Sequence, residues 1–308
     1  MAETKFYVFF DFEMLCSNRG MPYEDMEAIR LGAVKYHIET RKISYFDQFI
    51  RPTNLRPLNK FCKKLTGIED ADLVCANDFS EVFSSFLTWV GGVKKARFFS
   101  WSKSDLSRLK LDANKHQVPN STIMKIEKRY VDFQAVLSKR VSKDNLSVEN
   151  ALNLYGLTFV GQPHNPMYDA YNTLRVYLSF LHDPIQSDLI MLQKFVFGKK
   201  LTNRSAVNAM LRKSLKKDMK RLVSELEEIY SLKQVVKEMK RVRRLVVKYE
   251  NITINRSGLF SDDIIENVQL LKEFYKDLNS TYKDHFKHSS KVMILDEYTI
   301  QPIKQIAM

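Results

Sequence analysis

The sequence predicts a mixed α/β fold over about the first 180 residues, followed by a helical region. The first part contains five short strand-like segments that alternate irregularly with amphipathic helical segments. The change comes at HDPIQSD (182–188), where a proline ends the last helix of the mixed part. Two domains are therefore expected, at residues 1–184 and 185–308.

The strand-like segments are rich in aromatic and β-branched residues and lack helical amphipathicity. They are KFYVFFDFE (5–13), AIRLGAVKYHI (28–38), KISYFDQFIRP (42–52), ARFFSW (96–101) and RYVDF (129–133). The short connection between the second and the third suits a hairpin.

The helical segments of this part combine capping residues with apolar spacing. They are NKFCKKLTGI (59–68), DFSEVFSSFLTWV (78–90), SKSDLSRLKLDANKH (102–116), SVENALNLYGL (147–157) and NPMYDAYNTLRVYLSFLH (165–182). Asp78 or Ser80 is expected to cap the second helix, and Ser147 the fourth. Because strands and helices do not alternate strictly, their order predicts a mixed five-stranded sheet flanked by helices.

The C-terminal region is expected to be all α. Apolar residues recur at helical spacing over 206–246, with basic residues on the other face. The stretch 250–263 breaks this pattern, and Ser261 or Asp262 is expected to cap a second helix that runs to Leu278 or beyond. Two such helices either pair as a hairpin or extend as an arm.

The net charge of +13, from 49 basic and 36 acidic residues, predicts a polyanionic partner: nucleic acid, a membrane surface or an acidic protein. Residues 1–184 hold 25 basic and 21 acidic residues, a net charge of +4. Residues 185–308 hold 24 and 15, a net charge of +9. The excess is therefore mostly C-terminal.

Cysteine content and hydropathy predict a cytoplasmic protein without a membrane partner. The three cysteines, Cys16, Cys62 and Cys75, are odd in number and match no zinc spacing, which favours a reducing compartment. No uncharged apolar run reaches the ~18 residues of a membrane span. The beginning, MAETKFYVFFDFE, lacks the basic region of a signal peptide.

The strongest chemical signal is the pair Asp11 and Glu13. Residues two apart in a strand point to the same face, so two carboxylates would lie side by side in an apolar strand. Such a pair loses hydration and repels itself unless a cation neutralises it, and oxygen ligands suit Mg²⁺ or Mn²⁺. Alternatively, Asp11 lies past the strand end and Glu13 faces water.

Two further positions fit such a site. His164 lies in a loop five residues before Asp169, where it can place a base beside a helix carboxylate; the alternative is a capping histidine and an acid favoured by the helix dipole. Asp105 begins a helix after a strand, and Asp112 is its rival two turns further on. A site at the strand end favours Asp105.

The joint order of these residues resembles the DEDDh exonuclease superfamily, which has a ribonuclease-H-like fold. The local sequence is similar to the branch of the histone-mRNA and RNA-interference exonucleases and the KapD-type sporulation-inhibitor exonuclease of bacilli. Five stretches, within roughly residues 5–182, carry the resemblance in order: FFDFEMLC (9–16), RLGAVKY (30–36), RPLNKFCKKLTGI (56–68), SWSKSDLSRL (100–109) and GQPHNPMYDAYNT (161–173). One departure is Arg30, where members commonly carry an acid.

The resemblance implies a metal-dependent 3′–5′ exonuclease that releases nucleoside 5′-monophosphates from RNA or single-stranded DNA. It implies that Asp11 bridges two divalent cations, Mg²⁺ or Mn²⁺, and that Glu13 and Asp169 hold the one that activates water. Asp105 would support the second ion, and His164 would be the general base.

Three further residues are candidates for contact with the substrate. Met14 and Leu15 follow the carboxylates and are candidates to pack against the terminal base, and Phe61 is a candidate to stack on one; core packing is the alternative for each. A competing function is a nuclease-fold binding or scaffold protein with incidental catalysis. A further hypothesis is a homodimer through the C-terminal helices, because their apolar stripe resembles a coiled-coil seam.

Overall fold

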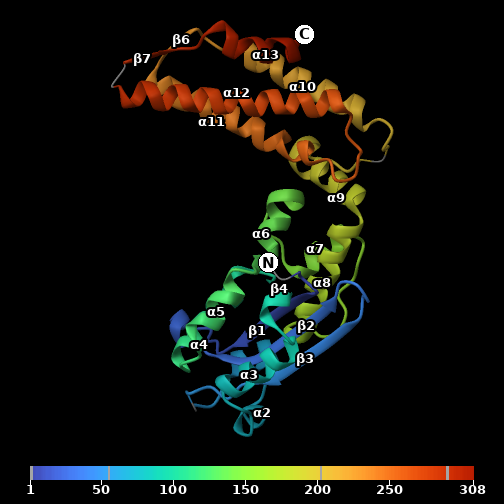
Figure 1. Ribbon diagram of the computed structural model, residues 1–308, viewed down its shortest axis with the longest axis vertical. Coiled ribbons are helices and arrows are strands. Elements are labelled where there is room, and N and C mark those ends of the chain that lie inside the picture. Colours follow the sequence, from blue (N-terminus) through green and yellow to red (C-terminus); the bar gives the residue numbers. More distant parts are fainter. Residues whose placement is uncertain (1–2, 55, 202, 289–290) are drawn as a thin grey trace. The chain divides into compact units, whose positions relative to one another are not determined.

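The computed structural model describes residues 3–54, 56–201, 203–288 and 291–308. The chain divides into two compact units, residues 1–182 and 183–308, and each is described by itself (Figure 1). Among the helices described, none combines the length and the apolar composition that a bilayer-spanning helix needs.

The first unit is built on a five-stranded mixed sheet of order β3-β2-β1-β4-β5, which confirms the predicted fold class. Its strands are β1 (Phe6–Met14), β2 (Ala28–His37), β3 (Ile43–Phe49), β4 (Ala96–Ser100) and β5 (Tyr130–Asp132). The first three strands pair antiparallel in chain order, whereas β4 runs parallel to β1 and β5 runs parallel to β4. β1 is therefore the central strand of the sheet, with two strands on either side.

Helices occupy both faces of this sheet. They are α1 (Lys60–Thr66), α2 (Asp70–Val74), α3 (Phe79–Val90), α4 (Lys103–Lys115), α5 (Asn120–Glu127), α6 (Phe133–Leu137), α7 (Val148–Leu154) and α8 (Pro166–His182), with the 3₁₀ turns η1 (Tyr23–Asp25) and η2 (Val93–Lys95) and the π-helical turn η3 (Ser138–Ser142). Asp78 caps α3 and Ser147 caps α7, as their sequences predict. The sequence analysis did not predict α2, α5 or α6.

The alternation of side chains along β1 decides which residues reach the core and which reach the site. Val8, Phe10 and Phe12 point to one face and pack in a buried cluster with side chains of α3, α4 and α5. Phe9 points to the other face, where its ring lies 5.4 Å from that of Tyr177 of α8. Residues 11 and 13 share this second face.

Gly32 allows α8 to lie directly on the sheet at this place. It pairs with Asp11 across β1 and β2. A Cβ atom at Gly32 would lie 2.0 Å from the backbone nitrogen of Met167 and 2.2 Å from the carbonyl carbon of Pro166. Because backbone atoms fill that space, only glycine permits the start of α8 to approach the strand so closely.

The second unit consists mainly of helices. Its elements are α9 (Pro184–Met191), the π-helical turn η4 (Leu192–Phe197), α10 (Val207–Val223), β6 (Ile229–Ser231), α11 (Leu232–Tyr249), the 3₁₀ segment η5 (Glu250–Ile254), α12 (Asp262–Lys287), β7 (Val292–Ile294) and α13 (Glu297–Ala307). Ser261 is the N-cap residue of α12, one of the two predicted starts. The helices α11 and α12 pack against each other, as do α10 and α13.

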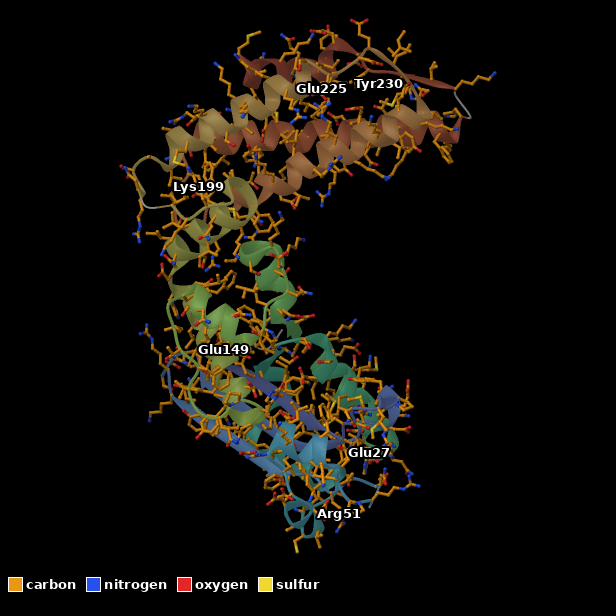
Figure 2. All side chains as sticks on the ribbon, turned by 180° about the vertical axis from the view of Figure 1, so that it is seen from behind. Glu27, Arg51, Glu149, Lys199, Glu225 and Tyr230 are labelled. Atoms are coloured by element: carbon orange, nitrogen blue, oxygen red, sulfur yellow. The ribbon has the colours of Figure 1, made fainter. Side chains whose placement is uncertain are left out.

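The helical pattern predicted over 206–246 as one stretch is wrong between residues 224 and 231. Here the chain leaves α10, forms β6 and restarts as α11 with a capping box at Ser231 (Glu225 and Tyr230 are labelled in Figure 2). The reason is non-local: β6 pairs antiparallel with β7, so that Tyr230 lies opposite Met293. The helical region therefore contains a two-stranded ribbon that periodicity did not predict.

The close approach at Gly32 yields a test. Gly32→Ala is expected to lower the free energy of unfolding by about 1–3 kcal/mol, because the added methyl group pushes α8 off the sheet. Gly20→Asn is a suitable control, since asparagine tolerates the positive φ there and nothing lies within 4 Å of an added Cβ. Denaturant unfolding measures both. Equal stability of the wild type and Gly32→Ala would contradict the packing described.

Candidate active site

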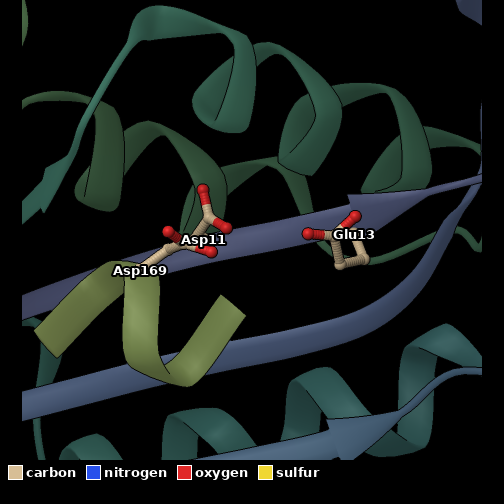
Figure 3. Close-up of side chains that lie close together, drawn as sticks. All are labelled: Asp11, Glu13 and Asp169. Carbon is tan, nitrogen blue, oxygen red and sulfur yellow. The ribbon is translucent and has the colours of Figure 1, made fainter. Parts of the chain in front are cut away.

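Three carboxylates meet on the α8 face of the sheet. Asp11 and Glu13 project from β1, and Asp169 reaches them from the first turn of α8 (Figure 3). Carboxylate oxygens of the three residues lie within 4.8 Å of one another. Asp11 is therefore inside the strand, and the alternative that it lies past the strand end is wrong.

A fourth carboxylate, Asp105, lies beside Asp11 at the start of α4. It is 4% exposed, accepts a 3.4 Å hydrogen bond from the Phe12 backbone N–H, and shares a side-chain hydrogen bond with Asp11. Asp112, its rival in the sequence, is held elsewhere. It forms a buried 2.9 Å ion pair with Arg108 and accepts from the Ala28 backbone N–H. The geometry thus brings Asp105, not Asp112, to the cluster.

The four carboxyl groups hold protons more tightly than usual. Burial, followed by the negative charges of its neighbours, raises the pKa of Asp11 well above its ordinary value. Burial and the charge of Asp169 raise the pKa of Glu13 to about 8. Burial likewise raises the pKa of Asp169 to about 7 and that of Asp105 to about 6, where hydrogen bonds to Asp105 oppose the effect. Without bound cations, the four carboxylates therefore repel one another when they are ionised.

The loop before α8 places His164 next to the cluster. Its φ of +61° is unusual for a residue other than glycine, and its backbone N–H donates to the Asp169 carboxylate. Asn165 then starts the helix, because its side-chain oxygen accepts from the Met167 backbone N–H at 3.1 Å. The His164 side chain is exposed.

Arg30 contributes a fixed positive charge next to Glu13. It stands opposite Glu13 in the β1–β2 ladder, and its charge lowers the pKa of that carboxyl against the effect of burial. Asp47 holds the guanidinium by two hydrogen bonds of 2.7 and 2.8 Å, and the Phe49 ring lies 4.7 Å away. Arg30, which replaces the acid common in the family, is therefore held in place by two side chains of β3.

The three residues expected to touch substrate lie in different environments. Met14 is half-buried and packs against the core beneath the sheet. Leu15 is only 6% exposed and belongs to a cluster with Ile29 and Cys62, so packing is the role that its contacts support. Phe61 on α1 is 41% exposed. Contact with substrate stays a prediction for all three.

Two residues were missed by the sequence analysis. Ser100, the last residue of β4, hydrogen-bonds to the Asp105 side chain and helps to fix it. Gly32 allows Asp169 to reach the cluster, as described above. The signal for Gly32 was present, because it stands in a strand of otherwise large residues, and glycine inside a strand marks a close backbone approach.

This donor set fits hard divalent cations. Four carboxylates in a partly apolar environment offer only oxygen ligands, which Mg²⁺ and Mn²⁺ prefer. Burial, together with the charges of neighbouring carboxylates, raises the pKa values of Asp11, Glu13 and Asp169, and the positive charge of Arg30 opposes this effect at Glu13. Cys16 is no alternative nucleophile, because burial raises the pKa of its thiol to about 12.

Comparison with known proteins places the same region among nucleases. The model of the RNase_T family, described as an exonuclease, matches residues 8–177. Human "ERI1 exoribonuclease 2" is 24% identical over 200 residues, which cover 58% of this chain and 28% of that protein. Mouse "3'-5' exoribonuclease 1" is 26% identical over 185 residues, covering 56% and 52%. The match thus spans about half or less of these relatives' length.

Solved structures agree on the fold of this region. The nuclease domain of 3'hExo, a DEDDh family member bound to rAMP, superposes with a TM-score of 0.54 at 22% identity, covering 60% of this chain and 97% of that chain. The cell-death related nuclease 4 (CRN-4) gives a TM-score of 0.51 at 22% identity, covering 58% and 64%. At this identity the likeness shows the fold, and it confirms the ribonuclease-H-like architecture.

The raised pKa values predict how stability depends on pH and metal. The folded protein binds protons that the unfolded chain has already lost, so metal-free protein should lose stability as the pH rises from about 4 to about 8. Mg²⁺ or Mn²⁺ should therefore raise the melting temperature more at about pH 8 than at about pH 5, where protons compete for the carboxylates.

A neutral variant provides the matched comparison. Asp169→Asn should stabilise the metal-free protein by about 2 kcal/mol near pH 8, by less than about half as much near pH 5, and should weaken the response to metal. Glu24→Gln, which removes an exposed acid, should behave as the wild type. Thermal melts in EDTA and in Mg²⁺ measure these effects. A wild-type stability that rises steadily from pH 5 to pH 8 in EDTA would contradict the account.

Proposed function

Because the chain belongs to the RNase_T exonuclease family, we propose that it is a metal-dependent 3′–5′ exonuclease that releases nucleoside 5′-monophosphates from RNA or single-stranded DNA. The observation that carries this is the convergence of Asp11, Glu13 and Asp169, with Asp105 beside them. Both curated relatives described above are named exoribonucleases, which favours RNA as the substrate.

Each residue of the cluster has a role in this mechanism. Asp11, Glu13 and Asp169 would hold one divalent ion, and Asp105 beside Asp11 would support a second. Bound ions of this kind stabilise the negative charge on the attacking and leaving oxygens of an in-line displacement. His164, whose side chain is exposed and whose loop is tied to Asp169, is the candidate general base that takes the proton of the attacking water.

The protein environment around these groups fixes their positions. The backbone N–H of His164 donates to Asp169, so the loop that carries the base is tied to a metal-holding carboxylate. Of the three candidate substrate contacts, Phe61 on α1 is the most exposed, whereas Met14 and Leu15 pack against buried clusters and would act by supporting β1. Catalysis is assigned to residues 1–184.

The three cysteines, Cys16, Cys62 and Cys75, are free thiols, which is in keeping with a cytoplasmic location.

The competing scaffold hypothesis retains less support. A protein that only binds nucleic acid has no need of four closely placed carboxylates, which repel a phosphate backbone unless cations neutralise them. The homodimer stays a prediction, and part of the apolar stripe that suggested it is accounted for within the second unit. The apolar residues of α10 that suggested a dimer seam, Leu211, Leu215, Met219 and Leu222, are buried inside the second unit.

The direct test is hydrolysis of 5′-labelled single-stranded RNA and DNA in Mg²⁺, Mn²⁺ or EDTA. We expect a ladder that shortens from the 3′ end, that needs a divalent ion and that a 3′-phosphate blocks. Asp11→Asn is expected to abolish it, and His164→Ala to lower the rate by about 10²–10⁴-fold, the range for loss of a general base.

The matched control is His182→Ala, which removes an exposed histidine at the far end of α8. It should retain wild-type activity. Hydrolysis at the same rate by the wild type, Asp11→Asn and His164→Ala would point to a contaminating nuclease. No hydrolysis by the wild type with any metal would favour the scaffold hypothesis.

A further inference from the structure

The second unit carries a groove of about 590 Å³ between α11 and α12. Three cations and two tyrosines dominate its lining, and no carboxylate contributes: Lys240, Arg243, Arg244, Tyr275 and Tyr282, with Val236 and Met239 as its apolar floor. The groove lies within the second unit and does not involve the carboxylate cluster.

The cations come from one helix and remain available to a ligand. Lys240, Arg243 and Arg244 of α11 are all exposed. Within the described part of the chain, Lys240 and Arg244 form no ion pair, and Arg243 has only a 3.3 Å contact with Glu250. Three cations at the rim of an apolar groove select an anionic occupant.

The aromatic side chains come from the other helix and form a stripe. Tyr275, Tyr282 and Phe286 are spaced by seven and four residues, so they lie on one face of α12. The Tyr282 and Phe286 rings are 6.1 Å apart, and Phe286 is 66% exposed. The guanidinium of Arg243 lies 5.7 Å from the centre of the Tyr275 ring, which joins the stripe to the cationic rim.

We propose that this groove is a binding site for single-stranded nucleic acid, separate from the catalytic cluster. Aromatic rings in a row offer stacking surfaces to successive unpaired bases, and cations along one side follow the phosphate backbone. A duplex buries its base faces in its own stack and cannot use the stripe, and an acidic peptide gains only the cations. The combination of an aromatic stripe and a cationic rim therefore favours an unpaired strand.

Binding can be measured without hydrolysis. The full chain is titrated against a fluorescein-labelled single strand of about 20 nucleotides in EDTA, and anisotropy is followed at several salt concentrations. The triple variant Lys240→Gln, Arg243→Gln, Arg244→Gln should weaken binding about tenfold or more and reduce the salt slope by about 2. Tyr282→Leu should weaken it about fivefold or more and leave the slope unchanged.

The control triple, Lys213→Gln, Lys216→Gln, Lys217→Gln, removes the same charge from exposed positions of α10. It should bind within about twofold of the wild type. Equal weakening by both triples would mean diffuse attraction by net charge and would overturn the proposal. Groove variants that bind the strand as tightly as the wild type would also overturn it. If these variants changed from dimer to monomer by light scattering while their affinity stayed the same, the groove would be a dimer interface instead.

Hydrolysis of thymidine 5′-(p-nitrophenyl phosphate) with Mn²⁺ separates this proposal from the proposed function. The groove variants should turn over this small diester at the wild-type rate. If the wild type binds the strand in EDTA but does not hydrolyse the diester, the proposed nuclease function is contradicted and the proposed binding site in the groove is not. Loss of diester hydrolysis in the groove variants would mean that the substitutions disturb the first unit, and would contradict a separate site.

Discussion

The repulsion among Asp11, Glu13, Asp105 and Asp169 is the constraint on which the site depends. Four acids that converge from β1, α4 and α8 in largely buried surroundings cannot all be charged without positive partners. The protein provides little relief, because Arg30 beside Glu13 is already held by Asp47. The fold therefore holds four carboxylates together with too little positive charge nearby. Divalent cations can supply that charge, and their binding is the physical basis of the proposed hydrolysis.

The fold meets this constraint with ordinary packing on the opposite face. Val8, Phe10 and Phe12 anchor β1 in the core, so the strand stays in place although its other face carries acids. Gly32 then opens the space through which α8 delivers Asp169. Stability and function are divided between the two faces of one strand, which follows from the two-residue period of side chains.

Much of the first unit could be predicted, because its signals are local. The alternation in β1, the caps Asp78 and Ser147, and the position of Asp105 at a strand end are all legible in short windows of sequence. The meeting of Asp105 with Asp11 depends on the parallel pairing of β4 with β1, which no local pattern contains. The resemblance to a family supplied that long-range information, and the structure supplies its geometry.

The second unit was less predictable for the same reason. The break between α10 and α11 depends on pairing with β7, more than sixty residues along the chain, and helical periodicity cannot register it. The groove likewise needs α11 and α12 to pack side by side before Arg243 meets Tyr275. The C-terminal charge excess predicted a polyanionic partner, and the packing indicates which of many basic residues adjoin an aromatic surface.

The central claim is that the carboxylate cluster is completed by divalent cations. Isothermal titration calorimetry of Mn²⁺ into metal-free protein near pH 7 tests it most directly, in two buffers of different ionisation enthalpy. The account predicts about two ions per chain, with protons released on binding because Glu13 and Asp169 titrate near this pH, and loss of binding in Asp11→Asn. Absent binding, or binding that Asp11→Asn leaves unchanged, would contradict it.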